Sequence, residues 1–291
     1  MSQFDDYEAH EEHFSKKDRR KPKGRRSVKE LKAAKESDTR DTFEDPSLQY
    51  LYGLGLITDV VGELKSGKEA TVYLAEGPQG SLAAKVYSDV AMRSFKDDQV
   101  YREGRYVDDQ HLQKIINQGS KTGLEPEQAL WILHEYRQLW EFFEAGLSVP
   151  RPAIGPGIDD IVRAGRVVLM DFIGDAPVAA PRLADTRLSP EDAADAFKQG
   201  VTLMVEMLRL GRVHGDFSSY NLLWHEGKVV AIDFPQTVDI RENPHARTLL
   251  KQDAESFCLS FRKLGIDKDP LELLGEVTRR AKLDLKSLQL L

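Results

Sequence analysis

Two aspartates and an asparagine stand close together in the stretch VHGDFSSYNLLWHEGKVVAIDFPQ, residues 213–236. Asp216 and Asn221 lie five positions apart in a segment with two serines, which favours a loop. Asp233 follows two short apolar runs joined by HEGK, the composition of a hairpin turn. The hairpin would return Asp233 to the side of Asn221. A carboxylate and an amide oxygen placed in this way suit a magnesium ion that takes its other ligands from water and phosphate.

The order of these three residues is typical of a phosphoryl-transfer site. In kinases a catalytic aspartate, a metal-binding asparagine and, after a hairpin, a metal-binding aspartate follow one another along the chain. On this interpretation Asp216 accepts a hydrogen bond from the attacking hydroxyl group, and Asn221 and Asp233 hold magnesium. A single aspartate is more often a cap or turn residue, so the prediction depends on the joint pattern. His214 is expected to pack and orient the loop.

A kinase site also needs a strand lysine, paired with an acid on a helix, to hold the ATP phosphates. Lys85 in SLAAKVY is the candidate, because its alanine and valine neighbours indicate partial burial. Ala83 lies on the same face of the strand and is small enough to leave room for adenine. Glu135 is an acid amid the apolar helical stretch ILHEYRQL, where burial without a cationic partner would be costly. The sequence therefore predicts a Lys85–Glu135 pair.

The stretch GELKSGKEATVY fits a phosphate-binding loop only in part. Gly62–Lys68 matches the start of a Walker A motif, but Glu69 stands where that motif needs a hydroxyl group for magnesium. A strand-like run follows, so the helix N-terminus that would bind phosphate is missing. We reject the Walker interpretation and predict a loop between two strands that lies over the phosphates. Ser66 and Lys68 would contact the nucleotide, and Val72 would cover the adenine.

Local patterns predict the elements that must position these residues. Residues 57–64, 69–77 and 81–88 are rich in β-branched and aromatic side chains between glycine-containing breaks, which predicts an antiparallel meander. Residues 126–145 carry apolar side chains at helical spacing, and 166–174 form a strand that runs into a linker.

The C-terminal part of the chain is predicted to be mostly helical. Ser189 as N-cap, Pro190 at the first helical position and Gly211 at the end delimit one helix. The segments QTVDI and HARTLLKQDAESF after Asp233 are expected to be structural only.

Composition restricts the class of protein. The 291 residues are 41% hydrophobic, which is ample for a core. A single cysteine, Cys258, cannot form an intrachain disulfide, so we expect a reducing compartment and no structural zinc site. No apolar run approaches the roughly 18 residues of a membrane span, and the N-terminus is polar. We therefore expect a cytoplasmic protein without a membrane segment or signal peptide.

Residues 1–45 are predicted to be a disordered, charged arm. They carry 12 basic and 12 acidic side chains with few large apolar residues and no sustained period. Within them KKDRRKPKGRR, residues 16–26, places eight basic residues in eleven positions. This run would bind the phosphates of RNA, including ribosomal RNA, or would serve only as a solvated arm, and both interpretations stay open. No aromatic residue is interleaved to stack on bases.

With these residues in place, the chain resembles the RIO family of atypical protein kinases, and most closely its type-one subgroup. The resemblance extends from about residue 60 to about residue 255. The SGKE loop and IDFP are its more diagnostic parts, because small-molecule kinases share the catalytic loop. The matching motifs are SGKEATVYLA, AAKVY, SFKDDQVYREGRY, EYRQLWEFFEAGLSVPRP, LMDFIG, VHGDFSSYNLLW, IDFPQTVD and NPHARTLLKQD.

The resemblance implies an α+β fold of the protein-kinase kind with two lobes and ATP between them. A small antiparallel sheet with one long helix, a nucleotide loop and the hinge would occupy residues 46–174. A shortened, mostly helical lobe with the catalytic and metal-binding loops would occupy residues 175–291. The hinge would be MDFI, with Met170 and Ile173 beside the adenine.

The resemblance also assigns roles to the site residues. Lys85 and Glu135 become the ion pair that positions the ATP phosphates, Asp216 the catalytic acid or base, and Asn221 and Asp233 the magnesium ligands. In this family the metal-binding aspartate can itself be phosphorylated, so Asp233 would take part in an ATPase switch. A protein substrate, or the chain itself by autophosphorylation, would accept the phosphoryl group, and the resemblance does not name that substrate.

The sequence departs from the usual pattern of the family at one place and from that of conventional protein kinases at two. Lys65-Ser66 stands where the family usually has Ser-Thr before Gly-Lys-Glu, which affects the phosphate contacts. The motif His-Gly-Asp lacks the arginine that would bind a phosphorylated activation loop. No Ala-Pro-Glu segment occurs in the 58 residues after Asp233, so a conventional peptide-binding platform is not expected.

Two other functions stay open. Small-molecule phosphotransferases of the aminoglycoside or choline kinase kind share HGD, the following asparagine and IDF, although they usually carry a larger C-terminal lobe. A nucleotide-switched scaffold with slow hydrolysis, acting on a ribonucleoprotein, would use the same residues.

Overall fold

The computed structural model describes most of the chain after the arm. The described residues are 46–67, 69–88, 99–102 and 126–283. The arm, with its basic run, and Lys68 lie outside them.

An antiparallel sheet of four strands, in the order β1-β2-β3-β4, forms the first part of the fold. The strands are β1 (Asp59–Ser66), β2 (Ala70–Gly77), β3 (Gly80–Tyr87) and β4 (Val167–Asp171). A two-residue connection joins β2 to β3, and Gly80 beside it has a φ of 132°, a conformation open to glycine. The predicted meander is confirmed, and the strand predicted at 166–174 joins it as β4.

One long helix, α7 (Pro126–Glu144), packs against this sheet, as the periodicity predicts. Ile132 and Tyr136 lie in the same apolar cluster as the sheet, and the Tyr136 hydroxyl donates to the β4 backbone at 3.0 Å. Gly146, with a φ of 77°, follows the end of the helix and donates to the carbonyl of Phe143. Two shorter helices complete this cluster, α3 (Pro46–Gly53) and α8 (Ile158–Ala164).

The second part of the fold is mostly helical. Helix α9 (Pro190–Arg209) begins after Ser189, whose hydroxyl accepts the N–H of Asp192 at 3.1 Å, as the capping pattern predicts. The remaining elements are α5 (Gln99–Arg102), β5 (Gly174–Asp175), β6 (Val178–Ala179), η3 (Leu183–Asp185), β7 (Arg212–Val213), β8 (Leu222–His225), β9 (Lys228–Ala231), β10 (Val238–Asp239), α10 (Ala246–Arg262) and α11 (Pro270–Arg280). Hydrogen bonds pair β5 with β6, β7 with β10 and β8 with β9.

Aromatic packing joins α9 to α10. The ring of Phe257 lies 4.6 to 5.4 Å, between centroids, from those of Phe197, Phe217 and Phe261. Gly200 makes this approach possible, because a Cβ atom there would lie 2.5 Å from the Phe257 ring. Phe217 belongs to the loop of predicted site residues, so the aromatic cluster packs directly against that loop.

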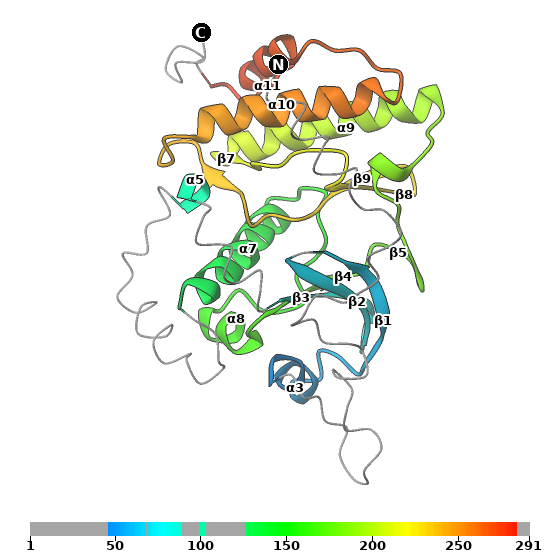
Figure 1. Ribbon diagram of the computed structural model, residues 1–291, viewed down its shortest axis with the longest axis vertical. Coiled ribbons are helices and arrows are strands. Elements are labelled where there is room, and N and C mark those ends of the chain that lie inside the picture. The colour runs from blue at the N-terminus through cyan, green and yellow to red at the C-terminus, as the bar shows by residue number, and fades with distance from the viewer. Residues whose placement is uncertain (1–45, 68, 89–98, 103–125, 284–291) are drawn as a thin grey trace, which may run out of the picture.

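Helix α7 belongs to both apolar clusters. Its Leu139 and Phe142 pack with α9, α10 and α11, whereas its earlier turns pack with the sheet. Figure 1 shows the three C-terminal helices as one layer, the sheet on the opposite side, and α7 between them. The predicted α+β fold, a small sheet with one long helix followed by a mostly helical part, is confirmed.

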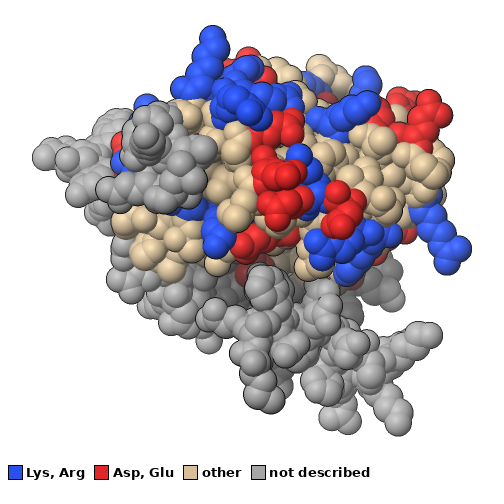
Figure 2. All heavy atoms as spheres, turned by 90° about the horizontal axis from the view of Figure 1, so that it is seen from above, with Lys and Arg blue, Asp and Glu red and all other residues tan. Residues whose placement is uncertain are grey.

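The outer face of the helical layer carries both signs of charge. Seen from above, acidic and basic side chains lie next to one another (Figure 2). Ion pairs on α10 and α11 include Arg262–Asp267 at 3.0 Å and Arg280–Glu276 at 3.3 Å. Such exposed pairs contribute little to stability. Among the described residues, none of the helices has the length and apolar character that a membrane span requires.

Candidate active site

Lys85 lies at the centre of a charged cluster. Its Nζ is 2.7 Å from Oε1 of Glu135 and 2.6 Å from Oδ1 of Asp233. Tyr87, two residues on along β3, donates its hydroxyl hydrogen to Oε2 of Glu135, and its ring centroid lies 4.8 Å from the Lys85 ammonium. A strand, a helix and the segment after β9 therefore converge on one lysine.

The members of this cluster differ in exposure and in charge. The side chain of Glu135 is 2% exposed and that of Asp233 is 43% exposed, so the open side of the cluster is at Asp233. Burial alone would lower the pKa of Lys85, but the two carboxylates hold it well above its usual value. Burial raises the pKa of Glu135, whereas Lys85 outweighs burial at Asp233 and holds that pKa below its usual value.

Asp216 and Asn221 form a second, hydrogen-bonded pair. Nδ2 of Asn221 donates to Oδ2 of Asp216 at 2.7 Å and to its carbonyl oxygen at 2.9 Å. Among the described residues none donates to the amide oxygen of Asn221, which leaves it available for a cation. Burial is the main reason that the pKa of Asp216 rises to about 6. Asn221 opposes this rise, and the charges of Asp233 and Glu69 add to it.

The β8–β9 hairpin brings the two pairs together. Leu222 pairs with Ala231 at the open end of the hairpin, and the N–H of Ile232 donates to the carbonyl of Asn221 at 3.0 Å. The next residue, Asp233, has a φ of 71°, in the left-handed region that residues other than glycine seldom adopt. The surrounding contacts must therefore hold this backbone in place.

Asp253 of α10 fixes the loop that carries Asp216. Its Oδ2 accepts the N–H of Gly215 at 2.9 Å and its Oδ1 accepts the N–H of Phe217 at 2.8 Å. Burial raises the pKa of Asp253 to about 7, although these two N–H groups oppose the rise. Sequence reasoning missed this residue by treating its segment as structural only. The available signal was an acid on the buried face of an amphipathic helix.

His214 packs beneath the loop, as expected. Its ring lies 5.5 Å from that of Phe217 and 5.4 Å from that of Phe234, between centroids. Its Nδ1 accepts the N–H of Asp216 at 3.3 Å. Burial lowers the pKa of His214 to about 4. The ring is therefore neutral near pH 7 and orients the loop backbone.

The residues predicted to surround adenine share one face of the sheet. Val72 pairs with Lys85 across β2 and β3, and Ala83 pairs with Met170 across β3 and β4. Cross-strand partners point to the same face, and residues two apart on a strand do so as well. Val72, Ala83 and Met170 therefore lie on the Lys85 face. Ile173 follows β4, and its carbonyl accepts a backbone hydrogen bond at 2.9 Å.

The loop between β1 and β2, which is predicted to lie over the phosphates, is closed by a hydrogen bond from the N–H of Gly67 to the carbonyl of Ala70 at 2.8 Å. Ser66, at the end of β1, shares a hydroxyl–hydroxyl hydrogen bond with Thr71 at 3.3 Å. The charge of Glu69, in this loop, adds to the rise in the pKa of Asp216. Lys68, in the middle of the loop, lies outside the described residues.

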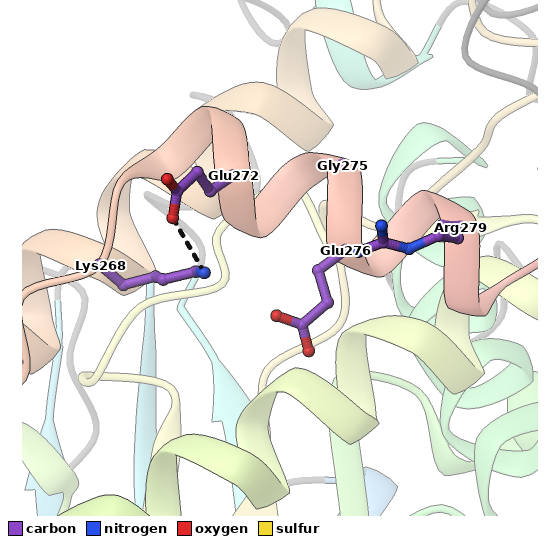
Figure 3. Close-up of a pocket in the computed structure, with 5 residues that line it drawn as sticks. All are labelled: Lys268, Glu272, Gly275, Glu276 and Arg279. Atoms are coloured by element: carbon purple, nitrogen blue, oxygen red, sulfur yellow. Dashed lines mark hydrogen bonds and ion pairs between the residues drawn. The ribbon is translucent and has the colours of Figure 1, made fainter.

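A surface hollow along α11 is separate from the predicted site. It has a volume of about 500 Å³ and lies along α11, where Lys268 and Glu272 form an ion pair at 3.1 Å (Figure 3). The predicted site residues do not line it. Its lining consists of Lys268, Glu272, Gly275, Glu276 and Arg279.

The sequence profile of the RIO domain matches residues 71–273, which contain all of these site residues except Ser66 and Lys68. The chain belongs to the RIO family. It is 34% identical over 227 residues to the serine/threonine-protein kinase RIO1 of Caenorhabditis elegans, covering 77% of this chain and 41% of that protein. It is 30% identical over 246 residues to the RIO-type serine/threonine-protein kinase Rio1 of Haloferax volcanii, covering 82% and 77%.

A solved structure of the same family has a similar fold. The Rio2 kinase of Chaetomium thermophilum, in an ADP/Mg²⁺-phosphoaspartate complex, aligns with a TM-score of 0.55 and 17% identity over 82% of this chain and 66% of that chain. RIO3 of Bos taurus is 30% identical over 263 residues, which cover 87% of this chain and 48% of that protein. The chain thus spans less than half the length of the worm and bovine RIO proteins.

Proposed function

We propose that this RIO protein transfers the γ-phosphoryl group of ATP, with Mg²⁺ as cofactor, as an atypical serine/threonine kinase or ATPase. The observation that carries the proposal is one cluster in which Lys85 joins Glu135 to Asp233, beside the hydrogen-bonded pair Asp216–Asn221. This combination of strand lysine, helix acid, loop aspartate and amide is what phosphoryl transfer requires. The names of the RIO relatives support the same activity.

The nucleotide would lie on the Lys85 face of the sheet. Lys85 would bind the ATP phosphates while Glu135 holds its ammonium group in place. Val72, Ala83 and Met170 would enclose the adenine, with Ile173 at the hinge. Ser66 and Lys68 would contact the phosphates from the loop above.

The residues present fit a magnesium ion. Asn221 keeps its amide oxygen available because its NH₂ group is engaged, and Asp233 is ionised and partly exposed. Mg²⁺ commonly binds through one or two protein ligands and takes the rest from water and phosphate. Within the described part of the chain, His, Cys, Asp and Glu do not gather in groups of three or more that would bind a metal without phosphate. When bound, the ion would neutralise charge on the phosphates.

Asp216 and Asp233 offer two routes for the phosphoryl group. In the first, Asp216 accepts the proton of a serine or threonine hydroxyl as that oxygen bonds to the γ-phosphorus and ADP leaves. In the second, a carboxylate oxygen of Asp233 attacks the γ-phosphorus, the bond to the bridging oxygen breaks and ADP leaves. Water then hydrolyses the acyl phosphate and regenerates Asp233.

Labelling with γ-³²P-ATP and magnesium tests the proposal. Hydroxylamine-sensitive label that disappears in Asp233→Asn would support the aspartyl-phosphate route. Acid-stable label on serine or threonine would support a protein kinase. A folded protein that binds nucleotide but neither gains label nor releases phosphate would contradict the activity and favour a nucleotide-switched scaffold.

Two further points are proposals from the sequence. We keep residues 16–26 as an RNA-binding run, supported by their charge, and expect affinity for ribosomal RNA to fall steeply between about 50 and 200 mM salt. A cytoplasmic location is supported by the single cysteine.

A further inference from the structure

A hydrogen bond ties α7 to the segment that follows Asp233. The Nε2 atom of His134 lies 2.8 Å from the carbonyl oxygen of Thr237, 103 residues further along the chain. A carbonyl oxygen only accepts, so Nε2 carries the hydrogen and donates it. His134 is the residue before Glu135, and Thr237 is four residues after Asp233. The bond therefore joins the two backbones whose acids both pair with Lys85.

Thr237 is a firm point of attachment. It is fully buried, and its N–H donates to the carbonyl of Phe234 at 3.1 Å. The next residue, Val238, pairs with Val213 in the β10–β7 ladder, and Val213 directly precedes His214. The hydrogen bond to Thr237 therefore connects α7, through the β10–β7 ladder, to the loop that carries Asp216.

A second fastening of α7 lies further along the helix. Oε2 of Glu141 is 2.9 Å from Nε of Arg212, and Nη1 of Arg212 is 2.7 Å from Oδ2 of Asp239. Glu141 is six residues beyond Glu135, which is about 9 Å along a helix. With that attachment alone, the first turns of α7 and the sheet on which they pack could pivot relative to the segment after Asp233. The His134 bond removes this freedom next to Glu135.

We propose that His134 is a positioning residue, which fixes Glu135 against Lys85 and Asp233 by fastening α7 to the Thr237 carbonyl. The role rests on the proposed function, because it concerns the geometry of phosphoryl transfer. Loss of one hydrogen bond lowers the equilibrium ratio of aligned to misaligned molecules about fivefold to tenfold, and this factor is the largest fall that the aligned fraction can show. The rate at saturating ATP should fall accordingly, while the global fold stays.

Two variants and a matched control test this role. His134→Leu removes the donor, and His134→Gln keeps an N–H at similar reach. Trp140→Phe is the control. It removes a hydrogen bond of the same kind from the same helix, in which Nε1 of Trp140 donates to the carbonyl of Ile154 at 2.9 Å and not to the segment after Asp233. Each protein is measured for thermal midpoint, for kcat and KM with ATP, and for hydrogen exchange of the backbone at residues 234–240.

We expect His134→Leu to lower kcat by a factor between about two and ten with KM changed less than about twofold, and to speed exchange at 234–240. His134→Gln should recover most of both effects, and Trp140→Phe should show neither. Equal losses in Trp140→Phe, no rescue by glutamine, or wild-type kcat and exchange in His134→Leu would overturn the role. If the wild-type protein neither hydrolyses ATP nor transfers its phosphoryl group, the proposed function fails. The exchange measurement alone then decides whether the His134 hydrogen bond holds the segment after Asp233 in place.

Discussion

At the scale of single residues, the two aspartates of the site differ because their neighbours differ. Asp233 has the Lys85 ammonium at 2.6 Å and stays ionised. Asp216 is more deeply enclosed and has a neutral amide as its partner, so burial raises its pKa to about 6. This separation suits a metal ligand that must carry charge and a base that must be ionised near neutral pH so that it can accept a proton.

Replacement of the base separates binding from transfer. We expect Asp216→Ala to lower phosphoryl transfer about 100-fold or more, because a positioned base contributes about that much. Nucleotide affinity should change little, since the residues proposed to bind ATP are untouched. Equilibrium binding of a fluorescent ATP analogue and single-turnover transfer measure the two quantities. A folded variant that no longer binds nucleotide would contradict the assignment.

The pKa of Asp216 predicts the direction of the pH dependence. The base must be ionised, and its raised pKa of about 6 means that it gains a proton as the pH falls through that value. kcat/KM should therefore decrease below about pH 6 and level off above about pH 7. His214, with a pKa of about 4, stays neutral over this range. Asp253, with a pKa of about 7, also gains a proton as the pH falls, which weakens its hold on the loop and adds to the same decrease. A profile measured from about pH 5 to 8 that is flat would rule out Asp216 as the base.

At the scale of elements, the close contact of α9 and α10 packs the aromatic cluster against the loop that carries Asp216. The buried ring of Phe257 fills the space at Gly200 and touches Phe217 of that loop. A shift of α10 would also move Asp253, which accepts the two loop N–H groups. A change in the packing of α9 against α10 would therefore displace the loop that carries Asp216.

Two glycine substitutions test this packing against helix propensity. Gly200→Ala should destabilise the fold by about 1 to 2 kcal/mol, because the added Cβ would lie 2.5 Å from Phe257 and the clash outweighs the gain in propensity. Gly275→Ala in α11 has no heavy atom within 4 Å of the added Cβ and should stabilise by about 0.5 to 1 kcal/mol. Urea midpoints measure both. A stabilised Gly200→Ala would show that α9 and α10 separate without cost.

At the scale of the whole molecule, we propose that the two lobes divide near residue 174. The sheet cluster and the helical cluster support this division, and α7 contributes to both. The charged cluster lies where they meet, since Lys85 comes from the sheet and Asp233 from the segment after β9. A ligand bound there would contact both lobes and so should stabilise the whole chain.

Nucleotide and metal should therefore raise the unfolding temperature together. At a free ligand concentration of about 100 times Kd, binding to the native state adds about 2.7 kcal/mol. We expect ATP with Mg²⁺ to raise the midpoint more than ATP with EDTA, and Asp233→Ala to lose that difference. Scanning calorimetry gives the four midpoints. An unchanged Mg²⁺ effect in Asp233→Ala would mean that the metal binds elsewhere.

Local sequence patterns were enough to predict most of the elements and the residues proposed for the site. The spacing of Asp216, Asn221 and Asp233 could be interpreted because a short loop and one hairpin bring them together, and both are local structures. The strands around Lys85 and the limits of α9 were predictable for the same reason: alternation, capping and helix-ending residues act over a few positions.

Contacts between distant segments became known only from the fold. Lys85 and Asp233 are 148 residues apart, and Asp253 and His134 gain their roles from backbone groups of distant segments. Such contacts depend on how the two apolar clusters pack and on the strand register, to which many weak interactions contribute together. An apolar helical pattern around an acid, as at Glu135, indicates from the sequence that the acid is buried. The fold shows which donor compensates for that burial.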